Sequence, residues 1–450
     1  MGDRKSRVNV DSILTAVSSK PCGSDKFYGL TQLDHAMGRH TVHVIFYFEK
    51  TPFGSFDMDP IRVSLSEVLS LYPAATGRLV RGEAGNWEVK CNDAGVRVLR
   101  ATVGVTLDEW LRSADGNEER DLTAWEDMPE FPNTWSPFRV QINDFQGGGV
   151  AIGLSCCHMN ADPTCLTLLF KAWTDTHRRL PIAYPPSFQP LKPRGQVSNN
   201  NTKSTSYLAN KLHKQTLSVK IATATFKFSD SIIKSCLSEI HDKYTDATPF
   251  DLLVALFWIR LTHLRGPKPS VHKHSLSICV DIRRRLQEPL PYGHFGNALH
   301  FSLLSLNVEE MDCSGLGRVT ELVHRHVSGL KEEEFWTTLR WLETQKEEGG
   351  KYAQAFTMYG PELTCVNMEH MVVEDQSMMY AASFDKATPV HVSCQIRNVE
   401  GEGLILVMPS AEGGYARTVT VTLPEEEIAK LCEDQAILQL EPKMLLCGRQ

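Results

Sequence analysis

Alternating apolar and polar positions predict β-strands in both halves of the chain. The runs are rich in β-branched and aromatic residues with a period of two, which sets alternate side chains on one face. In the first half they cover residues 41–48, 96–102, 138–142 and 150–157. In the second half they cover residues 222–228, 275–281, 299–306, 390–395, 404–408 and 418–422. The pattern predicts a sheet in each half.

Helix signals stand between these strands. Residues 63–71 have helical apolar spacing and end at Tyr72-Pro73, and another helix begins at Ser229. Thr248, Pro249 and Asp251 form a capping-box pattern that starts a helix over residues 252–264. This helix is apolar on nearly all sides, so we expect it to be buried. Residues 322–346 are rich in Glu, Lys and Trp and predict one exposed helix.

A change of composition separates the two halves. Residues 185–206 read PPSFQPLKPRGQVSNNNTKSTS, in which Pro, Asn, Ser and Lys replace the apolar periodicity. We therefore predict a first domain over residues 1–185, a linker over 186–206 and a second domain over 207–450. The fold class is mixed α/β, with helices packed around a mixed sheet in each domain.

Composition narrows the class of protein further. The 450 residues are 42% hydrophobic and 22% charged, with 47 Lys plus Arg against 54 Asp plus Glu. The charges are spread along the chain, so no nucleic-acid surface is expected. Twelve cysteines include no CxxC pair, which argues against a zinc site and for reduced thiols. No apolar run reaches the length of a membrane span, and we expect a cytoplasmic protein.

One segment carries a chemical signal. Three glycines, residues 147–149, precede the strand over 150–157, and His158 follows that strand directly. Asp162 then stands as an N-cap and Pro163 as the first residue of an amphipathic helix. The apolar stripe of that helix is Leu166, Leu169, Phe170 and Trp173. Because the glycines precede a strand rather than open a helix, they do not form a phosphate-binding loop.

The spacing His-x-x-x-Asp leaves two interpretations open. With 16 histidines in the chain, about one such match is expected by chance. A structural histidine beside a helix N-cap is therefore one interpretation of His158. The other is a catalytic base, because the positive end of the helix dipole depresses the pKa of a nearby imidazole and favours its neutral form.

Five segments in order resemble the BAHD family of plant acyl-CoA-dependent acyltransferases, and the resemblance covers nearly the whole chain. They are LTQLD (residues 30–34), LYPAATGRL (71–79), VQINDFQGGGVAIGLSCCHMNAD (140–162), TPFDLLVALFW (248–258) and VDIRRRLQEPLPYGHFGNAL (280–299). The resemblance implies two chloramphenicol-acetyltransferase-like domains with a channel between them. It favours the catalytic interpretation of His158.

The resemblance also implies roles for named residues. His158 would be the general base that deprotonates an acceptor, which then attacks the thioester of an acyl-CoA. Asp162 would point away from substrate and pair with an arginine such as Arg283. The partners implied are a small-molecule acyl-CoA and an acceptor, with no metal and no permanently bound cofactor. We expect a monomer. Residues that contact CoA are not assigned.

One motif departs from the family. Where BAHD enzymes carry DFGWGKP, residues 383–389 read SFDKATP. Ser383 replaces the family's aspartate, which pairs with an arginine, and Lys386 replaces its tryptophan, which lies close to the reaction centre. Asp385 is a candidate to restore the ion pair. Lys386 is a candidate to stabilise a developing oxyanion. The change indicates either a site adapted to a different acyl transfer or a site that has lost its catalytic activity.

Two branches of the family resemble this variant. The coumarin synthase branch is similar in DHAMGRHTVHVIFY, KCNDAGVRV and ASFDKATP, and the eceriferum-type wax factors are similar in WEVKCNDAGVRVLRA and TLDEWL. The first implies isomerisation of a 2-hydroxycinnamoyl-CoA followed by intramolecular acyl transfer to a coumarin. The alternatives are intermolecular O- or N-acylation, or a noncatalytic factor that assists fatty-acyl elongation.

Other candidates are weaker. Among the histidines that follow LTQLD, His40 is a candidate substrate contact, whereas His35 and His43 are expected to pack or lie on the surface. His370 lies in a methionine-rich region that we expect to be core. Its methionines, which could also line an acyl pocket, are Met368, Met371, Met378 and Met379.

Overall fold

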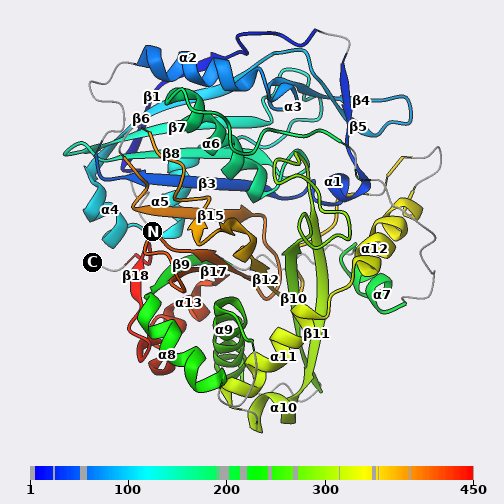
Figure 1. Ribbon diagram of the computed structural model, residues 1–450, viewed down its shortest axis with the longest axis vertical. Helices are drawn as coiled ribbons and strands as arrows, with labels where there is room; N and C mark the ends of the chain where they lie inside the picture. Colours follow the sequence, from blue (N-terminus) through cyan, green and yellow to red (C-terminus); the bar gives the residue numbers. More distant parts are fainter. Residues whose placement is uncertain are drawn as a thin grey trace.

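The computed structural model has two large sheets, one above the other in Figure 1, with helices packed against them. It describes residues 6–23, 26–50, 58–189, 191, 202–212, 220–241, 246–266, 272–313, 315–346, 351–352, 354–384 and 387–448. Both sheets mix parallel and antiparallel strands. The mixed α/β class predicted from the sequence is confirmed.

The first sheet has six strands. Their order is β1(Val8–Ala16), β6(Val96–Thr106), β7(Phe138–Gln146), β8(Val150–Cys157), β3(Thr41–Phe48) and β15(His391–Arg397). Every side chain of β3 and β8 is buried, since the two strands lie in the middle of the sheet with both faces covered. The last strand, β15, comes from the C-terminal part of the chain and pairs antiparallel with β3.

The second sheet has seven strands. Their order is β11(Leu299–Asn307), β10(Lys273–Asp281), β12(Leu363–Asn367), β16(Leu404–Pro409), β17(Arg417–Pro424), β9(Ile221–Phe228) and β18(Lys443–Leu445). A smaller sheet of β2(Phe27–Gly29), β5(Trp87–Lys90) and β4(Arg78–Arg81) lies at the side of the first. A two-stranded sheet pairs β13(Val372–Val373) with β14(Gln376–Ser377).

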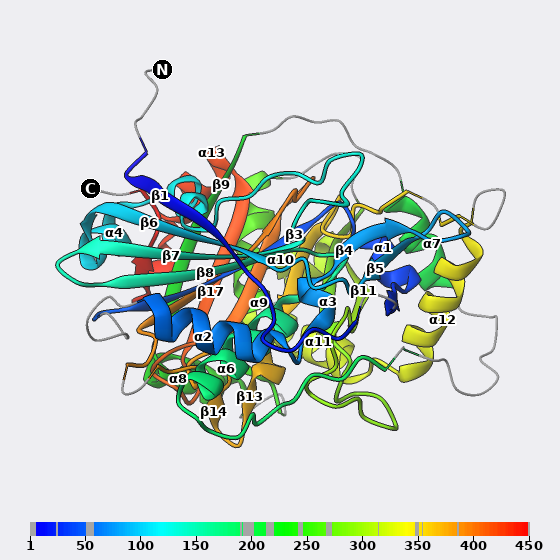
Figure 2. The ribbon, with the colours of Figure 1, turned by 90° about the horizontal axis from the view of Figure 1, so that it is seen from above.

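Helices cover the sheets. In the first half they are α1(Gln32–Ala36), α2(Met58–Leu69), α3(Pro73–Thr76), α4(Leu107–Ser113), α5(Gly116–Glu119) and α6(Pro163–His177). In the second they are α7(Thr202–Asn210), α8(Asp230–His241), α9(Pro249–Arg265), α10(Val308–Cys313), α11(Leu316–Ser328), α12(Glu332–Thr344), α13(Glu425–Leu431) and α14(Gln435–Leu438). Seen from above in Figure 2, α2 and α6 lie side by side, and α6 packs on β3 and β8.

Two helix starts follow the predicted capping chemistry. Thr248 caps α9 and forms the reciprocal capping box with Asp251, with Pro249 in the first position. Asp162 caps α6 through the Cys165 amide, with Pro163 in the first position. Each cap satisfies backbone amides that the helix itself leaves without a partner, a contribution of about 1 kcal/mol. As predicted, α9 is buried for most of its length.

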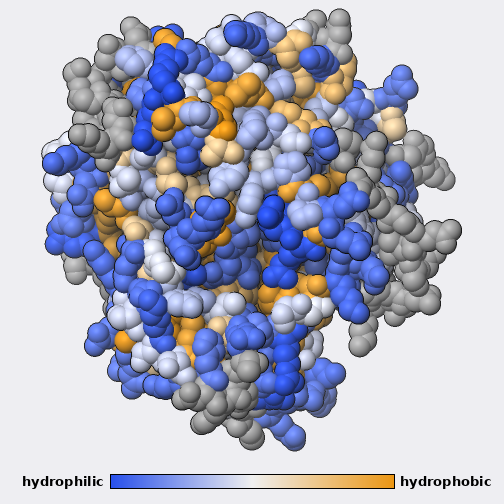
Figure 3. Space-filling model, in the orientation of Figure 1, coloured by the Kyte–Doolittle hydropathy of each residue, from blue (hydrophilic) through white to orange (hydrophobic). Residues whose placement is uncertain are grey.

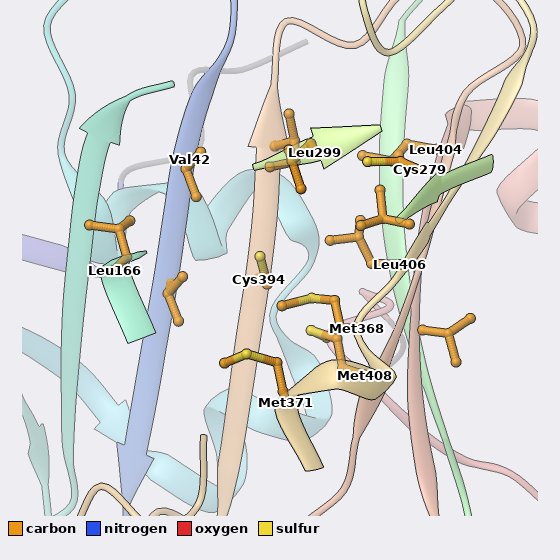
Figure 4. Close-up of a cluster of buried hydrophobic side chains, with 14 of the residues drawn as sticks. Val42, Leu166, Cys279, Leu299, Met368, Met371, Cys394, Leu404, Leu406 and Met408 are labelled. Carbon is orange, nitrogen blue, oxygen red and sulfur yellow. The ribbon is translucent and has the colours of Figure 1, made fainter. Parts of the chain in front are cut away.

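One hydrophobic core joins the two halves. Figure 4 shows Met368, Met371 and Met408 between β15, where Cys394 stands, and the second sheet. All four side chains are buried. Val42 of β3 and Leu406 of β16 belong to the same cluster although they lie in different sheets. The predicted methionine-rich core is confirmed, because flexible methionines fill the irregular space where the sheets meet.

The segment over residues 322–346 is wrongly predicted as a single exposed helix. The chain forms two helices there, because α11 ends at Gly329 and α12 begins after Lys331. Phe335, Leu339 and Leu342 of α12 recur at helical spacing and are buried. The acidic residues of that segment occupy only the outer face, which is why composition alone suggested exposure.

The predicted domain limits stay a prediction. Much of the linker over 186–206 lies outside the described residues. Its described start is tied to the second half, since the Ser187 amide donates to the Gly293 carbonyl at 2.8 Å.

On the face seen in Figure 3, polar and apolar residues are interspersed. Among the described residues, no helix combines the length and the apolar character that crossing a membrane requires.

Candidate active site around His158

His158 stands at the end of β8, where the central strand of the first sheet meets the second half. Its backbone amide donates to the His40 carbonyl at 3.0 Å, and its side chain is completely buried. Burial lowers the pKa of the imidazole to about 4, although the nearby Asp162 carboxylate opposes the change. The predicted neutral form is therefore present. Its main physical cause is the loss of solvation rather than the helix dipole.

Asp162 holds the loop that follows His158. Its carboxylate accepts hydrogen bonds from the Cys165 amide at 3.0 Å and the Ala298 amide at 3.1 Å. The guanidinium of Arg283 donates to both carboxylate oxygens, at 2.9 and 3.1 Å. Burial alone would raise the pKa of this carboxyl, but Arg283 and the amides outweigh burial and hold it below its usual value. The predicted Asp162–Arg283 ion pair is present.

Arg283 also fastens the loop that follows β10. This side chain is completely buried and contacts a second carboxylate, that of Asp281. It donates to the carbonyl oxygens of His294 and Gly296 at 3.1 and 3.0 Å. Burial would lower the pKa of the guanidinium, but the two carboxylates raise it above its usual value, so it is charged throughout the working pH range. One buried cation thus joins the His158 loop to the second half.

Asn297 orients the other side of His158. Its side-chain amide donates to the His158 carbonyl and to the Asp34 carboxylate, both at 2.8 Å. Asp34 is buried and is the capping-box acid of α1, where it also accepts from Thr31. Asn297 and Asp34 are not among the site residues predicted from the sequence. Their presence in two of the five matched segments was a usable signal.

Tyr359 contacts His158 directly and is not among the site residues predicted from the sequence. The phenolic oxygen lies 2.9 Å from Nε2 of His158, and both side chains are fully buried. The two residues are 201 positions apart. No periodicity or local motif marks Tyr359, because its importance comes only from the tertiary fold.

His40 and Lys211 hold the segment that carries Tyr359. Nε2 of His40 accepts from the Met358 amide at 3.1 Å, and burial lowers the pKa of this imidazole to about 3. The ammonium of Lys211 donates to the carbonyl oxygens of Met358 and Gly360, at 2.9 and 2.6 Å. Burial lowers the pKa of Lys211 to about 8. His40 therefore lies beside the site, and a contact with substrate remains a prediction.

The variant motif lies at the far end of the first sheet. Lys386 and Asp385 fall outside the described residues. Phe384, just before them, packs 6.2 Å from the Phe48 ring, and Phe48 pairs with Val150, the first residue of β8. Cys157, the last residue of β8, lies about 23 Å from Val150 at ~3.3 Å per residue, and His158 follows Cys157 directly. The oxyanion role of Lys386 stays a prediction.

Ser383 nevertheless keeps an arginine contact. Its hydroxyl accepts from the Arg178 guanidinium at 2.9 Å, just beyond the end of α6. Phe384 packs edge-on against Trp173 and His177 of that helix. In this chain the described part of the motif therefore ties β15 to α6 through a hydrogen bond from an arginine to a hydroxyl and through aromatic packing.

A cavity of about 370 Å³ opens where segments of both halves meet near the site. Its wall includes Met159, next to His158, together with His35 and Tyr352. Arg81 and Lys351 also line it and give it positive charge. His35 is held by the Trp87 amide, which donates to its Nε2 at 2.9 Å. Among the described residues, no cluster of three His, Cys, Asp or Glu side chains could hold a metal ion.

The arrangement is suited to proton transfer. A neutral imidazole whose Nε2 faces a hydroxyl, in a site shielded from water, can accept a proton from a positioned nucleophile. The surrounding backbone and side-chain contacts fix the ring from both halves of the chain. Burial raises the pKa of the neighbouring Cys156 and Cys157 thiols, so neither of them is poised as a covalent nucleophile.

Comparison with known proteins covers nearly the whole chain. A family model described as "Transferase family" matches residues 8–438. Protein ECERIFERUM 2 of Arabidopsis thaliana is 26% identical over 93% of this chain and 96% of its own. A hydroxycinnamoyltransferase of Narcissus pseudonarcissus is 25% identical over 94% of this chain and 98% of its own.

The fold has a close match among solved structures. Vinorine synthase superposes with a TM-score of 0.71 at 19% identity, over 96% of this chain and 98% of its own. This likeness supports the two-domain, chloramphenicol-acetyltransferase-like architecture. The family match over residues 8–438 shows that the chain belongs to the BAHD family of acyltransferases.

Proposed function

We propose that this protein is an acyl-CoA-dependent acyltransferase that uses His158 as general base and a hydroxycinnamoyl-type thioester as donor. The observation that carries the proposal is the neutral, buried imidazole of His158 between the two halves. The His158 backbone carbonyl accepts a hydrogen bond from Asn297, and the Asp162–Arg283 pair holds the loop that follows His158. The name of the Narcissus relative supports the choice of donor.

The reaction balances without a metal or a covalent enzyme intermediate. His158 takes the proton of the nucleophile's hydroxyl as its oxygen forms a bond to the thioester carbonyl carbon. When the carbon–sulfur bond breaks, the CoA thiolate takes that proton back from the imidazolium. The pKa of about 4 keeps His158 ready to accept a proton at neutral pH.

We further propose that the nucleophile is the ortho hydroxyl of the acyl group itself. A trans 2-hydroxycinnamoyl-CoA would isomerise to cis, and its phenol would displace CoA to form a coumarin. The resemblance of residues 34–47, 90–98 and 382–389 to the coumarin synthase branch supports this proposal.

The test uses purified full-length protein and hydroxycinnamoyl-CoA thioesters with and without an ortho hydroxyl. We expect thiol release and lactone fluorescence from the ortho-hydroxylated thioester with no added acceptor, and loss of both in His158→Ala. His391→Ala is the matched control, because His391 is equally buried and neutral but stands at the far end of β15. Release only with an added alcohol or amine would indicate intermolecular transfer.

The alternative is a noncatalytic role in fatty-acyl elongation. The similarity to Protein ECERIFERUM 2 is compatible with it. If His158→Ala releases thiol as fast as the wild type from every thioester, His158 is not the base and this alternative gains support.

A further inference from the structure

Tyr359 occupies the position where the nucleophile of an acyl transfer would meet the base. Its Oη lies 2.9 Å from Nε2 of His158, and the two rings are nearly parallel, at 28°. A general base needs its lone pair on Nε2, and in that tautomer the phenol donates to His158. A substrate hydroxyl can therefore bond to Nε2 only after Tyr359 has left.

The backbone that carries Tyr359 is fastened on both sides. The Phe356 amide donates to the Ala36 carbonyl and the Thr357 amide to the Lys211 carbonyl, each at 2.9 Å. Arg39 donates to the Thr357 hydroxyl at 2.6 Å. Lys211 and His40 hold the next residues, as described above. A swing of this segment away from His158 would break all of these bonds together.

The ring itself is also confined. The rings of His40 and Phe301 meet it edge-on, at centroid distances of 4.9 and 5.5 Å. None of the Tyr359 surface is exposed. In a densely packed interior a ring of this size has no empty space into which it could rotate. Tyr359 is thus a fixed neighbour of His158 and is not built as a movable cover.

A phenol that donates to His158 can still accept a hydrogen bond. Its oxygen has two acceptor lone pairs in addition to its single donor. A substrate hydroxyl that displaces the neighbours covering Oη can donate to it while Oη donates to Nε2, which forms a continuous path for a proton. Burial raises the pKa of Tyr359 well above its usual value, so the phenol keeps its proton at rest.

We propose that Tyr359 is a proton relay that carries the proton of the substrate hydroxyl to His158. This inference rests on the proposed function. As the substrate oxygen bonds to the thioester carbonyl carbon, its proton passes to Oη and the phenolic proton passes to Nε2. When the carbon–sulfur bond breaks, the same path returns a proton to the CoA thiolate, and both side chains end as they began.

The decisive variant is Tyr359→Phe, which removes only the hydroxyl. We measure kcat and KM with the thioester that the wild type turns over best. We expect kcat to fall about 100-fold, as for loss of a general acid–base group, with KM within threefold. Tyr380→Phe is the control, because the Tyr380 hydroxyl accepts from the Val392 amide, far from His158. Its kcat should equal that of the wild type.

A second measurement needs no variant. The wild-type rate is followed in mixtures of H₂O and D₂O. A relay moves two protons in one step and gives a curved dependence on deuterium fraction, whereas direct transfer to His158 gives a straight line. A straight line, or a Tyr359→Phe enzyme as fast as the wild type or faster, overturns the relay alone. A wild type that turns over no thioester overturns the proposed function and the relay together.

Discussion

Replacing Arg283 by Met tests whether one buried cation holds the two halves of the site together. The substitution removes a guanidinium that is completely buried and donates to both oxygens of Asp162, at 2.9 and 3.1 Å. It leaves the carboxylates of Asp162 and Asp281 without their cation. The carbonyl oxygens of His294 and Gly296 lose a donor as well.

The expected loss is large. Breaking a buried ion pair by removing one partner costs about 3–5 kcal/mol, and each carbonyl left without a donor adds about 1 kcal/mol. We expect Arg283→Met to lower the free energy of unfolding by about 5–7 kcal/mol. Typical folded proteins have only about 5–15 kcal/mol in total, so the variant should be marginally stable.

The assay is urea unfolding followed by far-ultraviolet circular dichroism and by tryptophan fluorescence. Coincident transitions from the two probes allow the free energies to be compared. Asp162→Asn and the double variant complete a cycle. Because Asp162 is uncharged in the Asn variant, the double variant should lose about 2–3 kcal/mol less than the sum of the single losses. A loss below about 1.5 kcal/mol for Arg283→Met, or simple additivity, would refute the reasoning.

Three further predictions concern the same site. The folded pKa of His158 is about 4 and only the neutral ring is a base, so kcat/KM should stay level down to about pH 5 and fall at lower pH. A decline centred near pH 6.5 would show that burial does not lower the pKa of His158. His158 and His300 are both buried with pKa values near 4, below the unfolded value of about 6.5, so the stability that they contribute is complete above pH 6.5 and is lost as the pH falls toward 4. The melting temperature should therefore drop between pH 6.5 and pH 4. A melting temperature that stays constant over this range would contradict the prediction. Lys211→Met leaves the carbonyl oxygens of Met358 and Gly360 without their donor and should reduce the free energy of unfolding by about 2–4 kcal/mol in urea, whereas exposed Lys220→Met should change it little.

Local chemistry was the most predictable part of the fold. The strand over 41–48 and the caps at Asp162 and Thr248 depend on residues that are neighbours in sequence, and all three are as predicted. The pairing of β15 with β3 was not predictable in this way, because it joins segments about 350 residues apart and depends on the packing of both halves.

The candidate site also contains residues that local sequence predicts and residues that only the tertiary fold brings together. His158 and Asp162 lie four residues apart, and their motif could be found. The Asp162–Arg283 pair spans 121 residues and was expected only from the family resemblance. Tyr359 could not be found, because nothing in its own neighbourhood distinguishes it from any other buried tyrosine.

The pairing of β15 with β3 also constrains how the chain can be made. During synthesis the first five strands of the first sheet, β1, β6, β7, β8 and β3, leave the ribosome long before residues 391–397 of β15. Until then β3 presents an open edge, which is a template for wrong pairing with other chains. A fragment ending in the 186–206 segment would keep that edge permanently. Expression of the first half alone should therefore give aggregates, and adding the second half in trans should rescue it only by supplying β15.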